Sequence, residues 1–311
     1  MKGLIVDTNK QFVLKENLER PTAEAGEVLV KVHSASVNPY DAESAQGRFD
    51  AYFKQYGVDK AVQSGLEFAG IVESDCERFK RGDRVFGYVD MISGWKSHAE
   101  VIAISEDYMA KLPNNLTYGQ GAALPLGSLT TLVALQDLGK VNSGMRVLIN
   151  GASGGLGIQG IQIAKILGAH VTAIAGPSQA EFLQSYGADE VFDYNQLSLP
   201  NLDSEFDGYF DVIIDLTNRQ TLAAMKRLLT PTGVFIPAEP NQENGGELED
   251  AQFGYLMVMH GDYEKLTTIA NWVEEGKLKA VVDQEFQFAD FQQAIARLQD
   301  KGRRGRIVMS W

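Results

Sequence analysis

The stretch that constrains this chain most runs from residue 146 to residue 157 and reads Arg-Val-Leu-Ile-Asn-Gly-Ala-Ser-Gly-Gly-Leu-Gly. An apolar run breaks into small residues, which lead directly into apolar positions at helical spacing. Ala152, Gly154 and Gly157 stand where a dinucleotide-binding turn needs small side chains, for the turn itself, for approach of a pyrophosphate and for helix packing. A helix beginning there directs unpaired N–H groups at an anion. The pattern therefore predicts a strand, a phosphate-binding turn and a helix.

Strand-like and helix-like segments alternate after residue 146, which is typical of a doubly wound parallel sheet. The predicted strands are 146–149, 170–174, 189–192, 210–214 and 232–236, and the predicted helices are 156–167, 179–185 and 219–229. The first third is instead β-rich, with strands predicted at 28–32, 67–72, 83–89 and 98–104. The chain is therefore expected to be an α/β protein.

The remaining segments connect these two parts. Residues 117–138 suggest one long helix, interrupted near Pro125 and Gly127. The C-terminal part predicts a hydrophobic strand at 253–259, a helix at 263–275, an apolar pair at 281–282, a helix at 289–299 and a strand at 306–309. This order predicts a nucleotide-binding domain inserted into a β-rich domain that is completed by the C-terminus.

Composition excludes some partners. With 28 Lys and Arg against 41 Asp and Glu, the net charge of −13 disfavours nucleic acid, which is bound through its phosphates. The N-terminal residues lack a signal-peptide core, and no apolar stretch is long enough to cross a bilayer. Cys76 is the single cysteine, so no internal disulfide can form. We therefore expect a cytoplasmic protein that binds a small molecule.

Six motifs occur in the order found in a known family. They are Ser34-Ala-Ser-Val-Asn-Pro-Tyr-Asp41, Gly65-Leu-Glu-Phe-Ala-Gly70, Lys80-Arg-Gly-Asp-Arg-Val-Phe-Gly87, Leu124-Pro-Leu-Gly-Ser-Leu-Thr-Thr131, Asn150 to Gly157, and Gly187-Ala-Asp-Glu-Val-Phe-Asp-Tyr194. The chain resembles the medium-chain dehydrogenase/reductases, and among them the zinc-free quinone oxidoreductase (zeta-crystallin-like) branch. The resemblance implies a GroES-like catalytic domain (1–117 and 261–311), a Rossmann domain (118–260), and a cleft between them where a nicotinamide meets its substrate.

The zinc-dependent relatives hold their catalytic metal with Cys, His and Glu side chains, of which this chain keeps only Glu67 at the matching places, and Glu67 alone is not a zinc site. Ser36 and Asn38 stand in the region of the first cysteine, and Ser64-Gly-Leu-Glu67 replaces the usual Gly-His-Glu. A single cysteine cannot build the four-cysteine structural site, and the four histidines have no metal-ligand spacing. The sequence therefore predicts an enzyme without zinc.

Without a Lewis acid, alcohol oxidation is disfavoured, whereas reduction of a quinone or an α,β-unsaturated carbonyl remains open. Such an acceptor takes hydride at carbon while charge develops on oxygen, where hydrogen-bond donors stabilise it. The resemblance makes Asn38 and Tyr40 the candidate catalytic residues, which would face the nicotinamide and donate hydrogen bonds to the acceptor oxygen. The same residues would also suit a proline-stabilised turn with Asn38 as its cap. Phe49 matches an aromatic of the substrate pocket and lacks the hydroxyl of some relatives.

The second nucleotide-domain strand ends in Ile174-Ala-Gly-Pro-Ser178 without the acid that holds the ribose of NAD, which favours NADPH over NADH. Gly176, Ser178 and Tyr194 are the residues expected near its 2′-phosphate. Arg219 or Arg304 would supply charge if the fold brought either close, and would otherwise be a solvated surface group.

Other cofactor contacts follow from the resemblance and from the strand ends. They are Thr130 near the nicotinamide, the backbone of Ser153, Gly154, Gly155, Leu156 and Gly157 at the pyrophosphate, and Thr217, Pro237 and Ala238 at strand ends. In the family, the edge strand matching 253–259 pairs with its copy, so a homodimer is expected. Two alternatives stay open: an enoyl-thioester reductase, which would need a basic patch at its cleft, and a non-enzymatic NADPH-binding or sensing protein.

Overall fold

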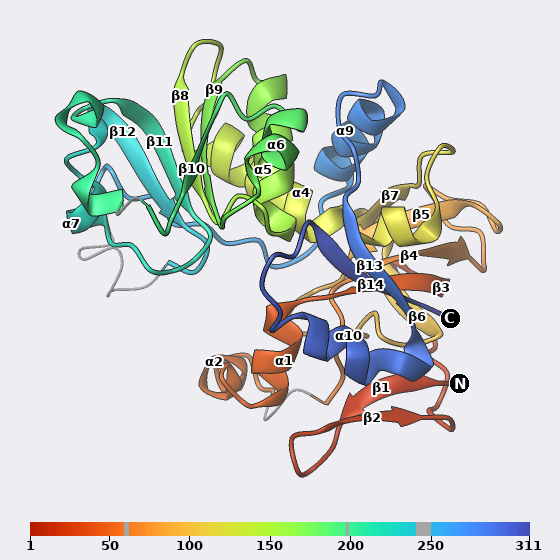
Figure 1. The fold of residues 1–311 in the computed structure, drawn as a ribbon. Helices are drawn as coiled ribbons and strands as arrows, with labels where there is room; N and C mark the ends of the chain where they lie inside the picture. The colour runs from red at the N-terminus through yellow and green to blue at the C-terminus, as the bar shows by residue number, and fades with distance from the viewer. Residues whose placement is uncertain (59–61, 197–198, 241–249) are drawn as a thin grey trace.

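The computed structural model describes residues 1–58, 62–196, 199–240 and 250–311, and its strands form two large sheets with helices around them. Figure 1 shows the two sheets in separate lobes, which we call the nucleotide lobe and the β-rich lobe. One cluster of buried apolar side chains continues through both lobes, so they share a core. In the described part of the chain, we find no helix long and apolar enough to cross a membrane.

The nucleotide lobe contains a five-stranded parallel sheet in the order β10-β9-β8-β11-β12. Its strands are β8 (Arg146–Asn150), β9 (His170–Ala175), β10 (Glu190–Asp193), β11 (Phe210–Asp215) and β12 (Leu229–Pro237). Chain order reverses between β8 and β11, and ligands of such sheets bind at the carboxyl ends beside that reversal. The five predicted strands are confirmed, and α5 (Gly155–Ile166) begins at the glycine turn, as predicted.

Two other helices belong to this lobe, α6 (Ala180–Ser185) and α7 (Leu222–Met225). The prediction of a helix over 219–229 is wrong at both ends. The Asp215 side chain accepts hydrogen bonds from the backbone N–H groups of Arg219 and Gln220, which fixes a loop there, and Leu229 already belongs to β12. The helix begins only after Thr221, whose hydroxyl caps it.

The β-rich lobe contains a seven-stranded sheet in the order β13-β14-β3-β4-β5-β7, with β6 paired to β3. Its strands are β3 (Glu27–Val37), β4 (Glu67–Val72), β5 (Arg84–Tyr88), β6 (Val101–Ser105), β7 (Met109–Lys111), β13 (Val282–Gln287) and β14 (Arg306–Ser310). β14 pairs antiparallel with β3, so the C-terminal strand completes the N-terminal sheet, as predicted. Residues 98–100, predicted as strand, precede β6, and the hairpin of β1 (Gly3–Val6) and β2 (Phe12–Lys15) was not predicted.

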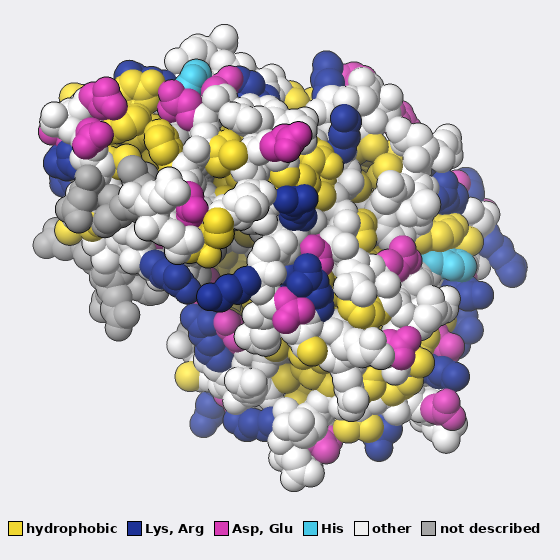
Figure 2. Space-filling view, in the orientation of Figure 1, with side chains coloured by type: hydrophobic (Ala, Val, Ile, Leu, Met, Phe, Trp, Pro, Cys, Tyr) yellow, Lys and Arg dark blue, Asp and Glu magenta, His cyan; other side chains and the backbone are white. Residues whose placement is uncertain are grey.

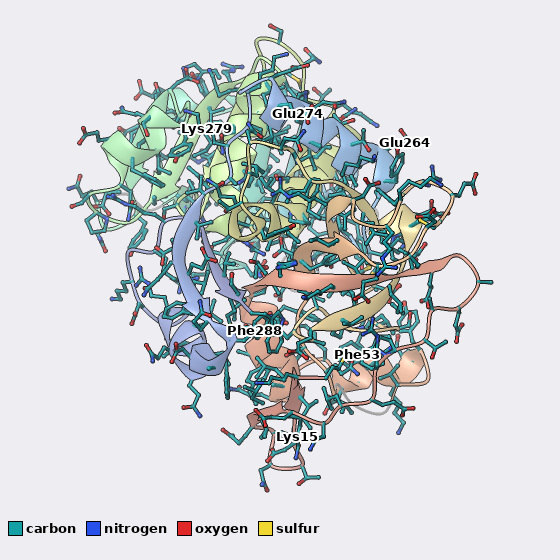
Figure 3. The ribbon with its side chains drawn as sticks, turned by 90° about the vertical axis from the view of Figure 1, so that its right-hand side faces the viewer. Lys15, Phe53, Glu264, Glu274, Lys279 and Phe288 are labelled. Carbon is teal, nitrogen blue, oxygen red and sulfur yellow. The ribbon has the colours of Figure 1, made fainter. Side chains whose placement is uncertain are left out.

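Helices connect and cover the two lobes. The predicted interruption near Pro125 is confirmed, because α3 (Tyr118–Ala122) and α4 (Pro125–Leu132) are separate helices, followed by a π-helical turn over 133–138. Four further helices accompany the β-rich lobe: α1 (Pro39–Ala45), α2 (Asp50–Gln55), α9 (Tyr263–Glu274) and α10 (Phe291–Arg297). Figure 3 shows Lys279, after α9, beside the nucleotide lobe, where its backbone N–H donates to Gln162 Oε1 at 2.9 Å.

The prediction of a strand at 253–259 is wrong for the single chain. Only Phe253 makes a β-bridge, with Phe235 of β12. Beyond that point the segment leaves the sheet edge and contacts the β-rich lobe, where the carbonyl of Val258 accepts a hydrogen bond from the Tyr88 hydroxyl at 3.0 Å. An extended segment without a neighbouring strand cannot form a ladder.

A substitution at Gly157 tests how closely α5 packs against the glycine turn. A Cβ there would lie 2.5–2.6 Å from the backbone of Ala152, which cannot yield as a side chain does. We expect Gly157→Ala to lower the free energy of unfolding by about 1–3 kcal/mol, as overpacking does. Urea denaturation followed by circular dichroism measures the change.

Gly160→Ala is the matched control on the same helix. The atoms nearest to its Cβ would belong to the side chains of Ile149 and Thr131, at 3.3 Å, and a helical alanine gains about 1 kcal/mol over glycine. Equal destabilisation by the two variants would contradict the role assigned to Gly157.

Candidate active site

The glycine turn after β8 fits a pyrophosphate. In the described part of the chain, the backbone N–H groups of Gly155, Leu156 and Gly157 have no acceptor within the protein. A Cβ at Gly154 would meet only the carbonyl oxygen of Gly151, at 3.5 Å, so there is space on that side of the turn, while Gly305 bridges Gly154 along the backbone. Free donors at a helix N-terminus, next to open space, are what an anionic group needs.

The carboxyl end of β9 meets an arginine from the other lobe. Arg304, before β14, donates to the Gln179 side chain at 2.9 Å and to the carbonyl of Ser178 at 3.1 Å. Gly176 and Tyr194 lie together at the same strand end, because a Cβ on Gly176 would be 3.3 Å from the Tyr194 hydroxyl oxygen. Figure 2 shows Lys and Arg side chains extending over the hollow between the two lobes.

Of the two candidate arginines, Arg304 is the one with hydrogen bonds at this strand end. Arg219 follows β11, which β8 separates from β9 in the sheet. Of the other predicted cofactor residues, Thr217, Pro237 and Ala238 follow or end β11 and β12, and Ala238 donates its N–H to the carbonyl of Asp215 at 2.9 Å. Thr130 is buried in α4, which packs against α5.

Aromatic side chains from the β-rich lobe lie beside the contact of Arg48 with the loop after β12. Tyr40 and Phe49 stack with ring centroids 4.8 Å apart, and the Arg48 guanidinium lies 5.4 Å from the Phe49 ring centroid. Arg48 also contacts the nucleotide lobe. Its guanidinium donates a hydrogen bond to the side chain of Glu239, the residue after Ala238, at 2.7 Å. Loops from both lobes are therefore joined at the end of β12.

Tyr40 also lines a small pocket within the β-rich lobe. Phe53, Ser64, Met91 and Lys96 are among its other lining residues. The Tyr40 hydroxyl oxygen is shielded from solvent and has no hydrogen-bond partner of good geometry among the described residues. Burial raises the pKa of Tyr40 well above its ordinary value, so the hydroxyl keeps its proton at neutral pH and can donate it in a hydrogen bond.

Asn38 belongs to a buried polar network rather than to an open wall. It is 2% exposed, and its amide group donates to Ser36 at 3.3 Å and to Glu67 at 3.2 Å. Its carbonyl oxygen accepts a hydrogen bond from Arg306, which forms an ion pair with Glu67. The other Glu67 oxygen accepts from the backbone N–H of Leu126, 2.7 Å away, in the first turn of α4. All hydrogen-bonding groups of the Asn38 side chain are thus engaged within the protein.

This region does not fit a zinc ion. Ser36, Asn38 and Leu66 offer a hydroxyl, an amide and an alkyl group, and the Glu67 carboxylate is paired with Arg306. Within residues 1–58, 62–196, 199–240 and 250–311, no group of three or more His, Cys, Asp and Glu side chains is arranged to hold a metal.

The fold and the glycine turn define a two-lobed dinucleotide-binding protein. Residues 24–137 match the family model described as alcohol dehydrogenase GroES-like domain, and residues 186–309 match the one described as zinc-binding dehydrogenase. The chain belongs to the medium-chain dehydrogenase/reductase family, which combines these two domains.

Relatives and solved structures agree with this assignment. The chain is 28% identical to the quinone oxidoreductase of Mus musculus, over 95% of this chain and 92% of that protein. It is also 28% identical to an NADPH-dependent alkenal/one oxidoreductase, chloroplastic, of Arabidopsis thaliana, over 95% and 75%. The structure of the quinone oxidoreductase from Coxiella burnetii superposes with a TM-score of 0.85 at 25% identity, over 100% and 99% of the two chains.

Sequence reasoning missed the Glu67–Arg306 pair and the Arg48–Glu239 contact. A signal for the first pair existed, because each residue is the lone charge in a strongly apolar strand, in Glu-Phe-Ala-Gly-Ile-Val and Arg-Ile-Val-Met. A buried charge needs a partner, and two opposite lone charges are candidates for each other. No comparable signal marks the second contact.

The buried pair can be tested by removing one partner. We expect Arg306→Met to lower the free energy of unfolding by about 3–5 kcal/mol, because it leaves the Glu67 carboxylate buried without its countercharge. Arg306→Lys is the control, since it keeps the charge and loses the hydrogen bond to Asn38. We expect it to cost less, and equal losses in urea denaturation would argue against an electrostatic role.

Proposed function

We propose that this protein is an NADPH-dependent oxidoreductase that transfers hydride to a quinone or to an α,β-unsaturated carbonyl compound without using zinc. The open glycine turn supports a dinucleotide, and the names of two relatives support this acceptor class. The domain boundaries 1–117, 118–260 and 261–311 and a cytoplasmic location are part of the proposal.

The cofactor would supply the hydride, and the chain would bind and orient both reactants. The backbone of residues 153–157 would hold the pyrophosphate, and Thr130, Pro237 and Ala238 would surround the nicotinamide. As charge develops on the acceptor oxygen, the Tyr40 hydroxyl would donate a hydrogen bond to it. Phe49 would form the apolar wall of the acceptor pocket, and Asn38 would act by holding Arg306 and Glu67.

The observation that carries NADPH rather than NADH is the position of Arg304. Its guanidinium lies at the carboxyl end of β9, beside Ser178, where a 2′-phosphate on the adenosine ribose would sit. No acidic side chain occupies residues 174–178 to hold a ribose diol instead. Ser178, Gly176 and Tyr194 would complete this end of the site.

Kinetics of an Arg304 variant test the cofactor choice. A hydrogen bond to a charged group contributes about 1.5–3 kcal/mol, and about 1.4 kcal/mol is a factor of ten. We expect Arg304→Gln to raise the KM for NADPH by tenfold or more and to leave the KM for NADH within twofold. Arg219→Gln, the control, should change neither. A preference of the wild type for NADH by tenfold would refute NADPH as the cofactor.

A panel of acceptors separates the proposed reaction from its alternatives. NADPH oxidation is measured with ortho- and para-quinones, enones and enoyl-CoA thioesters, and turnover is expected with the first two classes. Turnover with enoyl-CoA alone would make the protein an enoyl-thioester reductase. Tight NADPH binding without turnover of any acceptor would indicate a binding or sensing protein.

We also propose that the protein is a homodimer through the segment 253–259. Tyr255 and Met257 are 47% and 43% exposed there, and uncovered large apolar side chains favour association. Light scattering at micromolar concentration should give a dimer, and Met257→Asp should shift it toward the monomer. A wild-type monomer would contradict this proposal.

A further inference from the structure

Asp215, the last residue of β11, is a fully buried carboxylate with an unusually complete set of donors. One oxygen accepts from the Asn150 amide at 2.8 Å, from the Thr217 hydroxyl at 2.7 Å and from the Thr217 backbone N–H at 3.1 Å. The other accepts from the backbone N–H groups of Arg219 and Gln220, at 3.0 and 2.9 Å. The carboxylate therefore fixes the whole loop after β11.

These contacts determine what the Thr217 hydroxyl can offer to a ligand. A threonine hydroxyl has one proton and two lone pairs. The proton is given to Asp215, and one lone pair accepts from the Asn150 amide at 3.2 Å. One lone pair remains, so toward a bound molecule this hydroxyl can only accept a hydrogen bond.

The strand order says which part of a dinucleotide reaches Thr217. In the sheet, β9 carries the Arg304 contact, β8 carries the glycine turn, and β11 and β12 follow in that order. A dinucleotide with its adenosine at β9 and its pyrophosphate at β8 would therefore place its second ribose next to β11. Thr217 lies close to the turn, since a Cβ on Gly151 would be 3.2 Å from its methyl carbon.

We propose that Thr217 accepts a hydrogen bond from a hydroxyl of the nicotinamide ribose, and that Asp215 is the positioning residue that turns the Thr217 proton away from the cofactor. This inference rests on the nicotinamide cofactor proposed above. It excludes a contact from the Thr217 hydroxyl to a phosphate oxygen or to the carboxamide oxygen, because neither carries a proton.

Two variants of Thr217 and two ligands test the contact. NADPH contains the nicotinamide ribose, and 2′,5′-ADP contains only the adenosine part. We expect Thr217→Val to weaken NADPH binding about tenfold, the loss that corresponds to about 1.4 kcal/mol, and to leave 2′,5′-ADP binding within twofold. Thr217→Ser keeps the hydroxyl, so its NADPH dissociation constant should stay within threefold of the wild-type value. Fluorescence titration gives both dissociation constants.

The carboxamide NH₂ group is the other donor at this end of the cofactor, so the 3-acetylpyridine analogue of NADPH, which lacks it, completes the test. The same tenfold loss with this analogue supports the ribose contact. If Thr217→Val has no effect on the analogue while it weakens NADPH, the contact is to the carboxamide and the proposal is wrong. An unchanged NADPH constant, or equal weakening of NADPH and 2′,5′-ADP, also overturns it.

Asp215→Asn tests the positioning role. We expect it to raise the ratio of the NADPH to the 2′,5′-ADP dissociation constant at least fivefold, with circular dichroism confirming the fold, and an unchanged ratio contradicts the role. Should the wild type bind NADH instead of NADPH, the NADPH preference fails, but the Thr217 test is repeated with NADH and ADP. Wild-type protein that binds neither cofactor overturns both proposals.

Discussion

The ion pair between Glu67 and Arg306 is the interaction on which the rest of the site depends. It joins β4 to β14 inside the core, with side-chain exposures of 0% and 5%. Through Leu126 the carboxylate also caps α4, where a negative charge is favourable, and the Arg306 side chain crosses so close to Gly155 at the start of α5 that a Cβ there would be 2.1 Å from it. The two members of the pair thus lie against the first turns of α4 and α5.

Removing two charges from water is costly, and the network around the pair shows how that cost is offset. Ser36 and Asn38 supply further hydrogen bonds to Glu67, and Asn38 also accepts from Arg306. Burial lowers the pKa of Arg306 to about 10, so its charge persists at neutral pH. Asn38 is engaged in this network, whereas the buried Tyr40 hydroxyl has no hydrogen-bond partner of good geometry among the described residues.

The sequence predicted what depends on local patterns and missed what depends on contacts between distant residues. The alternation of apolar strands with a glycine turn and an apolar-periodic helix is written within residues 146–166, and that part of the fold is confirmed. The length of α7 depends on where the Asp215 side chain points, and the segment expected as a strand at 253–259 makes one bridge to β12 and then contacts the β-rich lobe. Arg48 and Glu239 are 191 residues apart, and neither stands in a pattern that reveals its partner.

The contacts between the lobes differ in strength according to their burial, and this difference suits an enzyme that must exchange a cofactor. Arg48 and Glu239 are 50% and 43% exposed, and exposed pairs contribute about 0–1 kcal/mol. Burial and the neighbouring Glu43 carboxylate raise the pKa of Glu239, although Arg48 lies beside it. At the end of β9, Arg304 contacts two neutral acceptors, the Gln179 side chain and the Ser178 carbonyl, and the Phe182 ring. The contacts at the rim of the two lobes are therefore exposed to solvent, while the Glu67–Arg306 pair that joins β4 to β14 is buried.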